Sequence, residues 1–438
     1  MSMTEAARLR RARWGVNLLF LGNGAMWANL VPRLPDIRER LEVSYAGFGV
    51  AVAFSSIGAI ALGLLAGTAI RRFGSARVAS TTLALQALAV SGAGLSGSVV
   101  LFALCLFLNG ALDSITDVAQ NAHGLIVQRR MGRSIINSLH AMWSAGAAIG
   151  AFLGQTAVTA NVNITVHLIT AAVVFAGVAF IAKRMMLPDS QTRTAEIVTE
   201  PHHTEHHHTE HHPDNTDHAH PTKRTRRLGI PAPAALALGM LGLVAIAGAS
   251  VEDSGFTWSS NYMADSIKAP TSIIGYALVG LMSLHFVGRI TGDRLVDRFG
   301  ARTVVRCGGI VTMLGMGAAL AWPSAWSTIV GFSVAGLGVA TTVPVAFAAS
   351  DTVEGLGEGT GVTITSWLLR ISFLAGPPLV GAVSDATSLR VGLLIIPVAG
   401  LGVTLLAGRL PGRLHPHAHD HPLTTESQDA ATAANSGE

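Results

Sequence analysis

The chain has 438 residues, of which 50% are apolar and only 13% are charged, and its mean hydropathy is +0.47. A soluble globular protein of this length needs more polar surface, so this composition excludes that class and indicates a membrane-embedded protein. The two cysteines, Cys105 and Cys307, lie inside apolar runs and predict no disulfide framework.

Apolar segments of about 20 residues, the length that crosses a membrane as a helix, occur six times on each side of a polar linker. The first begins with "RLRRARW" as a signal sequence does, but no small-residue cleavage site is obvious, so we expect an uncleaved first helix. The expected spans lie near 14–32, 47–69, 78–96, 99–124, 135–158 and 163–182, and then near 233–258, 272–292, 303–322, 326–349, 360–384 and 389–408.

The two groups of spans look like copies of one unit. Phe73 and Gly74 match Phe299 and Gly300 at an offset of 226 residues, and the same offset relates Gly110 to Gly336 and Gly150 to Gly376. The predicted fold class is therefore an all-α membrane protein with 12 transmembrane helices in two pseudo-symmetric six-helix bundles. The predicted domains are 1–182, a linker at 183–231, a second bundle at 232–410 and a tail at 411–438.

Most of the 30 Lys and Arg residues fall in segments on one side of the membrane when both termini are placed in the cytoplasm. The positive-inside rule therefore predicts cytoplasmic termini, and it explains the net charge of +4 without a nucleic-acid partner. The loop 351–358 is an acidic exception on that side.

The linker contains "EPHHTEHHHTEHHPDNTDHAHP", in which histidines alternate with acids and threonines without apolar periodicity. Such a composition favours a disordered, solvated tether. An alternative is loose binding of Zn²⁺ or Ni²⁺, for which His203, His207 and His211 have a suitable spacing. The tail is read in the same way, as a disordered cytoplasmic segment.

Two loops carry a glycine and arginine pattern between adjacent helices. The loop "GRITGDRLVDRFGAR" (288–302) presents Asp297, Arg298, Gly300 and Arg302, and its counterpart "GTAIRRFGSAR" (67–77) presents Gly67, Arg72, Gly74 and Arg77. These loops resemble the signature of the major facilitator superfamily. The resemblance implies two bundles that rock about a central site, with the loops latching the inner face shut. In the first loop Arg71 stands where the acid is expected, so that latch is expected to be weaker or differently built.

Four further segments carry a closer resemblance. These are "RLPDIRERL" (33–41), "QNAHG" (120–124), "HAMWSAG" (140–146) and "VEDSGFTWSSNYM" (251–263). Together they resemble a branch of bacterial inner-membrane facilitators whose substrates are mostly unassigned. The fifth span reads "GAAIGAFLG" without the glycine-proline pair of drug/proton antiporters. The chain has "GPP" in its eleventh span instead.

The fourth span contains Asn109, Asp113, Asp117 and Asn121, which recur every four residues and so share one helical face. Asp113 is expected near the midplane, with Asp117 about 6 Å closer to the cytoplasm. An ionised carboxylate at that depth costs several kcal/mol unless it is paired or wetted, so these acids are expected to face a central cavity. A carboxyl group that is neutral when dry and ionised when wet suits proton coupling. The alternative is a carboxylate locked permanently to an arginine or an amide.

The second half has its own intramembrane charges. Glu252 and Asp253 lie in the seventh span, and Arg370 lies about 15 Å into the eleventh, beyond easy reach of the surface. We expect Arg370 to hold one of Asp113, Asp117 and Glu252, or an anionic substrate. Arg289 is expected to support the loop latch. His285 is a candidate proton relay, although a lone intramembrane histidine is also often a packing group.

The proton-coupling candidates are therefore Asp113, Asp117, Glu252, Asp253 and His285. The substrate-binding candidates are Asn23, Trp27, Asn109, Asn121, His140, Trp143 and Arg370. The function this predicts is proton-driven secondary transport of a small polar organic solute, with symport slightly favoured, by a monomer in the cell inner membrane. No enzymatic motif and no cofactor are expected. The alternatives are a drug or metabolite antiporter and a metal-handling or sensor protein that uses the histidine linker.

Overall fold

The computed structural model describes residues 3–190, 231–353, 355–357 and 359–410, and every regular element within these ranges is helical. The first half contains α1 (Met3–Leu30), α2 (Leu34–Arg40), α3 (Tyr45–Gly63), α4 (Leu65–Phe73), α5 (Ser75–Leu95), α6 (Val99–Met131), α7 (Ile136–Thr159) and α8 (Ile164–Met185). The second half contains α10 (Ala232–Asn261), α11 (Tyr276–Phe299), α12 (Ala301–Ala321), α13 (Ala325–Val339), α14 (Thr342–Asp351), α15 (Thr360–Ala386), α16 (Leu389–Gly392) and α17 (Ile395–Leu406). Residues 191–230 of the predicted linker, which include His203, His207 and His211, and the tail at 411–438 lie outside the described residues, and their roles stay predictions.

In the described ranges, nine helical segments are long and apolar enough to cross a membrane. The helices α1, α7 and α11 are also long enough, at 28, 24 and 24 residues, but they carry more polar side chains. These twelve segments coincide with the twelve predicted spans, so the predicted fold class is confirmed. Several spans consist of two helices in line, such as α3 with α4 and α13 with α14.

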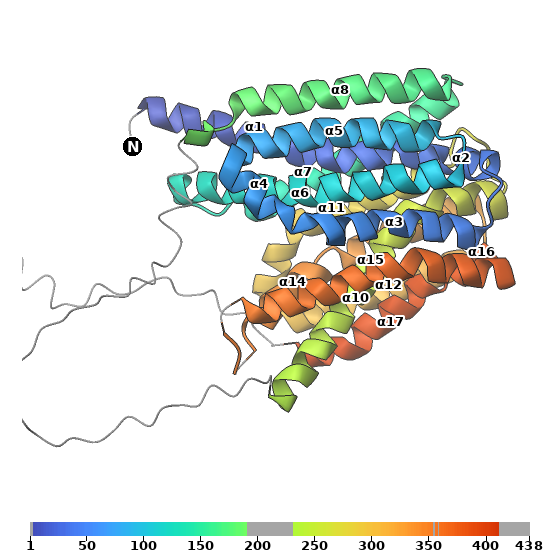
Figure 1. Ribbon diagram of the computed structural model, residues 1–438. Coiled ribbons are helices and arrows are strands. Elements are labelled where there is room, and N and C mark those ends of the chain that lie inside the picture. The colour runs from blue at the N-terminus through green and yellow to red at the C-terminus, as the bar shows by residue number, and fades with distance from the viewer. Residues whose placement is uncertain (1–2, 191–230, 354, 358, 411–438) are drawn as a thin grey trace, which may run out of the picture.

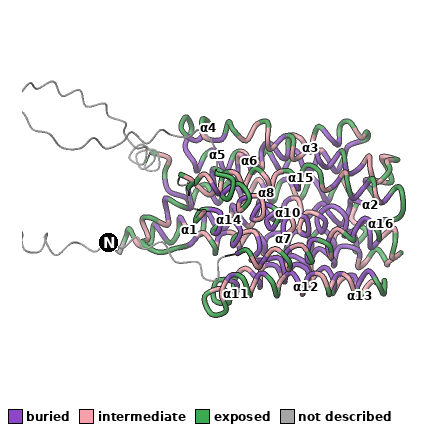
Figure 2. The backbone as a smooth tube through the Cα atoms, turned by 90° about the horizontal axis from the view of Figure 1, so that it is seen from below, coloured by how far each residue is buried: buried purple, intermediate pink, exposed green. Residues whose placement is uncertain are grey.

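The helices lie roughly side by side and form two groups (Figure 1). The start of α1, the end of α8 and the start of α10 lie at one end of the molecule, which we call the linker end. The elements α2 and α16 lie at the opposite end, which we call the α2 end (Figure 1). Buried residues concentrate inside the bundle, whereas exposed ones mark the ends and the outward helix faces (Figure 2). Large apolar side chains such as Val173 and Leu104 are exposed on these outward faces, as a lipid-facing surface requires.

The internal repeat is visible in backbone geometry. Gly74 has φ 88° and ψ 150°, and Gly300 has φ 82° and ψ 149°. Both end a helix in a conformation that side chains with a Cβ rarely adopt, which explains why glycine recurs there. In both repeats the preceding arginine lies 5.4 Å from the ring centroid of the neighbouring phenylalanine. The duplication predicted from the sequence is therefore present at the level of turn conformation.

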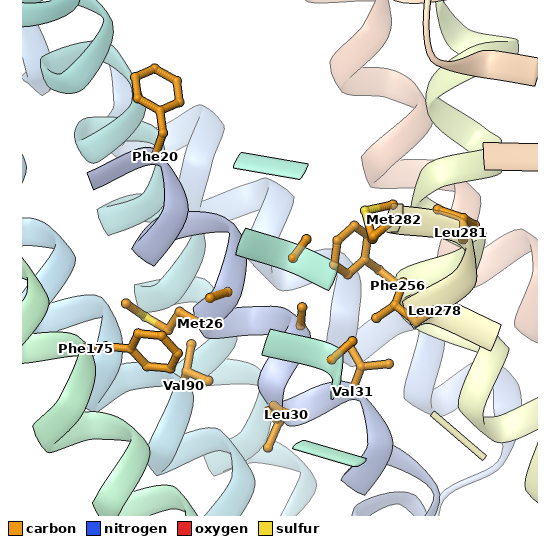
Figure 3. Close-up of a cluster of buried hydrophobic side chains, with 14 of the residues drawn as sticks. Phe20, Met26, Leu30, Val31, Val90, Phe175, Phe256, Leu278, Leu281 and Met282 are labelled. Carbon is orange, nitrogen blue, oxygen red and sulfur yellow. The ribbon is translucent and has the colours of Figure 1, made fainter. Parts of the chain in front are cut away.

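The apolar core is continuous between the two halves. In the first half, Met26, Val90 and Phe175 lie close together, and Val31 lies beside Phe256 and Leu278 of the second half (Figure 3). These residues belong to one buried cluster that includes side chains from both halves. The halves are therefore packed against each other in this conformation, rather than joined only by the linker.

Three glycines of α7 hold it against α1. A Cβ on Gly146, Gly150 or Gly154 would run into the backbone of Leu21, Ala25 or Asn29, respectively. The spacing of four residues places all three on one face, and this small-residue stripe lets two membrane helices approach closely. The close approach fixes the position of α1, which supplies Asn23 and Trp27 to the centre of the molecule.

We predict that Gly150→Val destabilises the protein, because the added side chain forces α1 and α7 apart. Overpacking of this kind costs about 1–3 kcal/mol. The matched control is Gly177→Val in α8, where nothing lies within 4 Å of an added Cβ. Thermal unfolding of the purified protein followed by intrinsic fluorescence would measure both variants. Equal unfolding temperatures for the two would contradict this account of the α1–α7 contact.

Candidate functional site

Two adjoining cavities lie between the halves. The upper cavity has a volume of about 280 Å³, and its wall includes Asn23, Trp27, Gln86, Asn109, Asp113, Trp143, Glu252, Asp253, Phe256 and Phe373. The lower cavity has a volume of about 310 Å³, and its wall includes Ser56, Ile60, Asp113, Asp117, Phe347, Ser366, Arg370 and Phe373. Asp113 and Phe373 line both, so the two cavities meet at these side chains. Seven of the predicted substrate or proton-coupling residues line the upper cavity.

Asp113 is held by a chain of hydrogen bonds in the first half. Trp143 Nε1 donates to Asn23 Oδ1 at 2.8 Å, and Asn23 Nδ2 donates to Asp113 Oδ1 at 2.7 Å. Gln86 Nε2 also donates to Asp113 Oδ1, at 3.0 Å. An indole N–H can only donate, so it fixes the orientation of the Asn23 amide and directs its N–H group at the carboxyl group. Both amides bind the same oxygen, so Asp113 Oδ2 has no hydrogen bond to a described residue.

The acids of the second half differ in their partners. Arg289 on α11 interacts electrostatically with Glu252, and its Nη1 atom donates to the His140 carbonyl at 3.2 Å. Arg289 therefore lies near Glu252, and its support of the loop latch stays a prediction. Asp253 makes no hydrogen bond or ion pair with any other described residue, although it lines the upper cavity.

Asp117 and Arg370 line the lower cavity together and interact electrostatically. Arg370 is not within 4.0 Å of a carboxylate in the described part of the chain, and its guanidinium lies 5.8 Å from the Trp367 ring. Asn121 Nδ2 donates to Asp117 Oδ1 at 3.0 Å. Arg370, which we predicted to pair with an intramembrane acid, therefore lines the same cavity as Asp117 of the fourth span. A direct ion pair between the two stays a prediction.

The remaining candidates lie beside the two cavities rather than on their walls. His285 is buried, and its Nδ1 atom is 3.3 Å from Ser144 Oγ. The His140 ring packs edge-on against Phe20 at 5.3 Å. Asn121 reaches the site only through Asp117. The proposed relay role of His285 and the substrate contacts of His140 and Asn121 stay predictions.

The seam between α7 and α11 is closed over its length. At the α2 end, Gln155 accepts from the Gly275 N–H at 2.6 Å, and at mid-length Ser144 meets His285. At the linker end, Asn137 Nδ2 donates to Asp293 Oδ2 at 2.7 Å. These contacts cover 18 residues of α7, or about 27 Å at the rise of an α-helix.

The seam between α3 and α15 is closed at one end only. At the α2 end, the Asp385 carboxylate accepts from the Tyr45 and Ala46 N–H groups, at 2.9 Å each, and so caps the start of α3 from the other half. Further along, Ser56 and Ile60 of α3 face Ser366 and Arg370 of α15 across the lower cavity. The cavity therefore separates these helices towards the linker end, and Asp117 beside it is exposed.

A second cross-half contact reinforces the α2 end. Arg38 on α2 forms an ion pair with Asp265, with Nη2 and Oδ2 2.8 Å apart. The Tyr45 hydroxyl donates to the same oxygen at 3.0 Å, and the Arg38 guanidinium lies 4.5 Å from the Tyr45 ring centroid. Arg38 lies in "RLPDIRERL", one of the segments that carry the closer family resemblance, and Asp265 lies two residues after another of them, "VEDSGFTWSSNYM".

The two signature loops do not meet across the halves in this conformation. Arg302 donates to the Leu410 carbonyl at 2.9 and 3.1 Å, and Asp189 accepts from the Ala76 N–H at 3.0 Å, so each interaction stays within its own half. Asp297 is exposed and has no hydrogen bond or ion pair to a described residue. The cross-half contact near this loop is made instead by Asp293. The latch roles of Gly67, Arg72, Gly74, Arg77, Asp297, Arg298, Gly300 and Arg302 stay predictions.

Several residues of the site and its closures were missed by the sequence reasoning. Gln86 was visible as a lone amide in the apolar run "TTLALQALAV", which is the same signal that identified the acids of the fourth span. Asp265 and Asp385 lie at span ends, where acids are common, so nothing in the sequence singled them out. Arg38 lay within a recognised segment but had no assigned partner.

The architecture and the central polar cavities define a membrane transporter with two helical halves. A family model described as Major Facilitator Superfamily matches residues 16–251 and 238–434. The chain belongs to this superfamily, and its predicted membership is confirmed.

Similar proteins are found among curated sequences and solved structures. An uncharacterized transporter of Sinorhizobium fredii is 26% identical over 90% of this chain and 96% of its own. The membrane protein MosC of Rhizobium meliloti is 24% identical, with coverage of 87% and 86%, respectively. A crystal structure of the nucleoside transporter NupG matches with a TM-score of 0.65, covering 91% of this chain and 98% of that one, at 11% identity. The last likeness concerns the fold alone.

We predict that Arg38→Gln loosens the closure at the α2 end, because it removes the ion pair to Asp265. An ion pair of this kind stabilises the closed end by about 1 kcal/mol, so its loss is expected to raise the fraction of molecules open at the α2 end roughly fivefold. The measurement is the labelling rate of a Val52→Cys probe by an impermeant maleimide applied from the α2 side, with Cys105 and Cys307 replaced by Ala. The control is Arg40→Gln, because Arg40 bonds to the Gly94 carbonyl within the first half. An unchanged rate in Arg38→Gln would refute the gating role.

Proposed function

We propose that this transporter moves a small polar organic solute across the cell inner membrane, driven by the proton gradient, with the linker end in the cytoplasm. The observation that carries the proposal is the setting of Asp113. It lines both cavities, two amides bind one of its carboxyl oxygens, and the other oxygen has no hydrogen bond to a described residue.

This setting suits a group that gains and loses a proton. A carboxylate permanently paired with an arginine stays ionised, because arginine does not lose its proton in proteins. Asp113 has amide partners in place of a guanidinium, and an amide can bind the oxygen of either the ionised or the neutral group. Closing the cavity removes water and favours the neutral form, whereas opening it favours ionisation. Asp117 and Glu252 have arginines nearby, and we propose that they serve mainly in charge balance.

The wall of the upper cavity fits the proposed class of solute. Trp27, Trp143 and Phe256 supply flat apolar faces, and Asn23 and Asn109 supply amide groups. Ligand sites commonly combine apolar walls with a few polar groups that fix orientation. Asp117, which lines the lower cavity, is exposed, and this exposure supports an entrance at the linker end. With the proposed orientation, this conformation is open to the cytoplasm.

We predict that Asp113→Asn abolishes accumulation of solute against its gradient while leaving binding or exchange partly intact. Asn keeps the size of the side chain but cannot carry a proton. The measurement is proton movement in proteoliposomes with an internal pH dye, on addition of solutes found by a thermal-shift screen. Asp36→Asn outside the cavity serves as a control. Full proton-driven accumulation by Asp113→Asn and by the double variant with Asp117→Asn would refute the coupling role.

We predict that Arg370→Ala inactivates transport and that Arg370→Lys restores little of it. The guanidinium can bind a carboxylate through two N–H groups at once, and an ammonium cannot reproduce this geometry. The measurement is the transport rate at matched protein amounts in the membrane. A fully active Arg370→Ala would show that Asp117 does not depend on this cation.

A further inference from the structure

The pair Pro377 and Pro378 lies within α15, next to the upper cavity. A proline has no N–H group, so each one leaves the carbonyl four residues earlier without its helical hydrogen bond. The carbonyls concerned are those of Phe373 and Leu374. In a membrane interior, a free carbonyl has to find a donor within the protein, in water or in a ligand.

The Phe373 carbonyl is directed towards the cavity. A Cβ on Gly49 of α3 would run into the Pro377 carbonyl, so the Pro377 oxygen points at α3. Phe373 precedes Pro377 by four residues, and its carbonyl therefore lies on about the same face of α15, about 6 Å nearer the linker end. Phe373 lines both cavities, as does Ser56 of α3. Leu374 lines neither of the two.

Asp253 lies against the same turn of α15. A Cβ on Gly376 would come 3.2 Å from Asp253 Oδ2. In the described chain Asp253 has no donor and no cation bound to it, whereas the neighbouring Glu252 interacts with Arg289. The other guanidinium nearby, Arg370, lines the lower cavity with Asp117 and is absent from the wall of the upper one.

A carboxylate and a free carbonyl oxygen both accept hydrogen bonds, and here both belong to residues that line the upper cavity. An ammonium group suits such a pair, because it donates several hydrogen bonds at once and also offsets the charge of the carboxylate. The aromatic side chains of Trp27, Trp143 and Phe256 line the same cavity, and aromatic faces also attract cations. The geometry points to a cation-binding subsite formed by Asp253 and the Phe373 carbonyl, and we propose that it binds the protonated amino group of the transported solute.

This inference rests on the proposed function for the identity of the occupant, because it narrows the polar organic solute to one that bears an amine. The site itself is testable without transport. An alkylammonium stays protonated at neutral pH, as lysine does, so a simple amine can serve as the probe.

The experiment compares benzylamine with benzyl alcohol, which has the same ring but lacks the charge. Each is titrated into the purified full-length protein in detergent, and binding is followed by thermal unfolding and by tryptophan fluorescence. We expect a saturable stabilisation by benzylamine and none by benzyl alcohol. Asp253→Asn is expected to weaken the benzylamine affinity by roughly tenfold or more, because a charge-assisted hydrogen bond is lost.

The proline variants test the part played by the carbonyl. Pro377→Ala supplies an N–H donor to the Phe373 oxygen and is expected to weaken benzylamine binding by roughly threefold or more. Pro378→Ala is the matched control, because it supplies a donor to Leu374, which lies on neither cavity wall. Equal affinities in the two proline variants would overturn the role of the Phe373 carbonyl. Equal stabilisation by benzylamine and benzyl alcohol, or full benzylamine binding by Asp253→Asn, would overturn the cation site.

A second arm identifies the source of the cation. The titrations are repeated at low ionic strength, with and without added sodium chloride. If sodium stabilises the protein through Asp253 and benzylamine does not, the assignment to a solute amine is overturned and the subsite binds an inorganic ion. Because binding is measured at equilibrium without a proton gradient, a failure of Asp113 as proton carrier would leave benzylamine binding in place. The two proposals therefore fail separately.

Discussion

A charge inside a membrane has to find its counter-charge or its hydrogen-bond donors within the protein, because lipid supplies neither. In this protein that requirement is met differently for each acid. Glu252 has Arg289, Asp117 has Arg370 across the lower cavity, and Asp113 has two amides. The amide partners of Asp113 all belong to the first half, so its setting can persist when the halves move. The Asp117–Arg370 interaction crosses between halves and must change with them.

The two seams between the halves indicate where such movement can occur. The α7–α11 seam has polar contacts from Gln155 to Asn137, so opening it requires several hydrogen bonds to break together. Among the described residues, the α3–α15 seam has its hydrogen bonds at the α2 end, where Asp385 caps α3. Towards the linker end this seam already borders the lower cavity. Towards the linker end, opening the α3–α15 seam therefore requires fewer hydrogen bonds to break than opening the α7–α11 seam.

The fold was predictable because its physical cause is local to the sequence. A run of about 20 apolar residues specifies a span almost regardless of its neighbours, and the glycines at 74 and 300 specify matching turns. The site was predictable in part for the same reason. An acid in an apolar run has to face the interior, which identified Asp113, Asp117, Glu252 and Asp253. Which acid lies near which arginine was not predictable, because this depends on the relative rotation of helices that are distant in sequence. The sequence accordingly did not predict that Arg289 lies near Glu252, or that Arg38 contacts Asp265.

Charge balance connects the two proposals made above. With Glu252 and Asp117 offset by Arg289 and Arg370, two carboxyl groups of the upper cavity, Asp113 and Asp253, have no cation near them. Closing and drying a cavity that holds two unpaired negative charges is costly, because each buried charge loses its hydration. A proton on Asp113 together with an ammonium group at Asp253 leaves no unpaired charge, whereas either alone leaves one. On the proposed assignments, the halves can therefore occlude the cavity most readily when both are bound. This requirement favours movement of proton and solute in the same direction, because a protein that carries only one of them meets a higher barrier to closure.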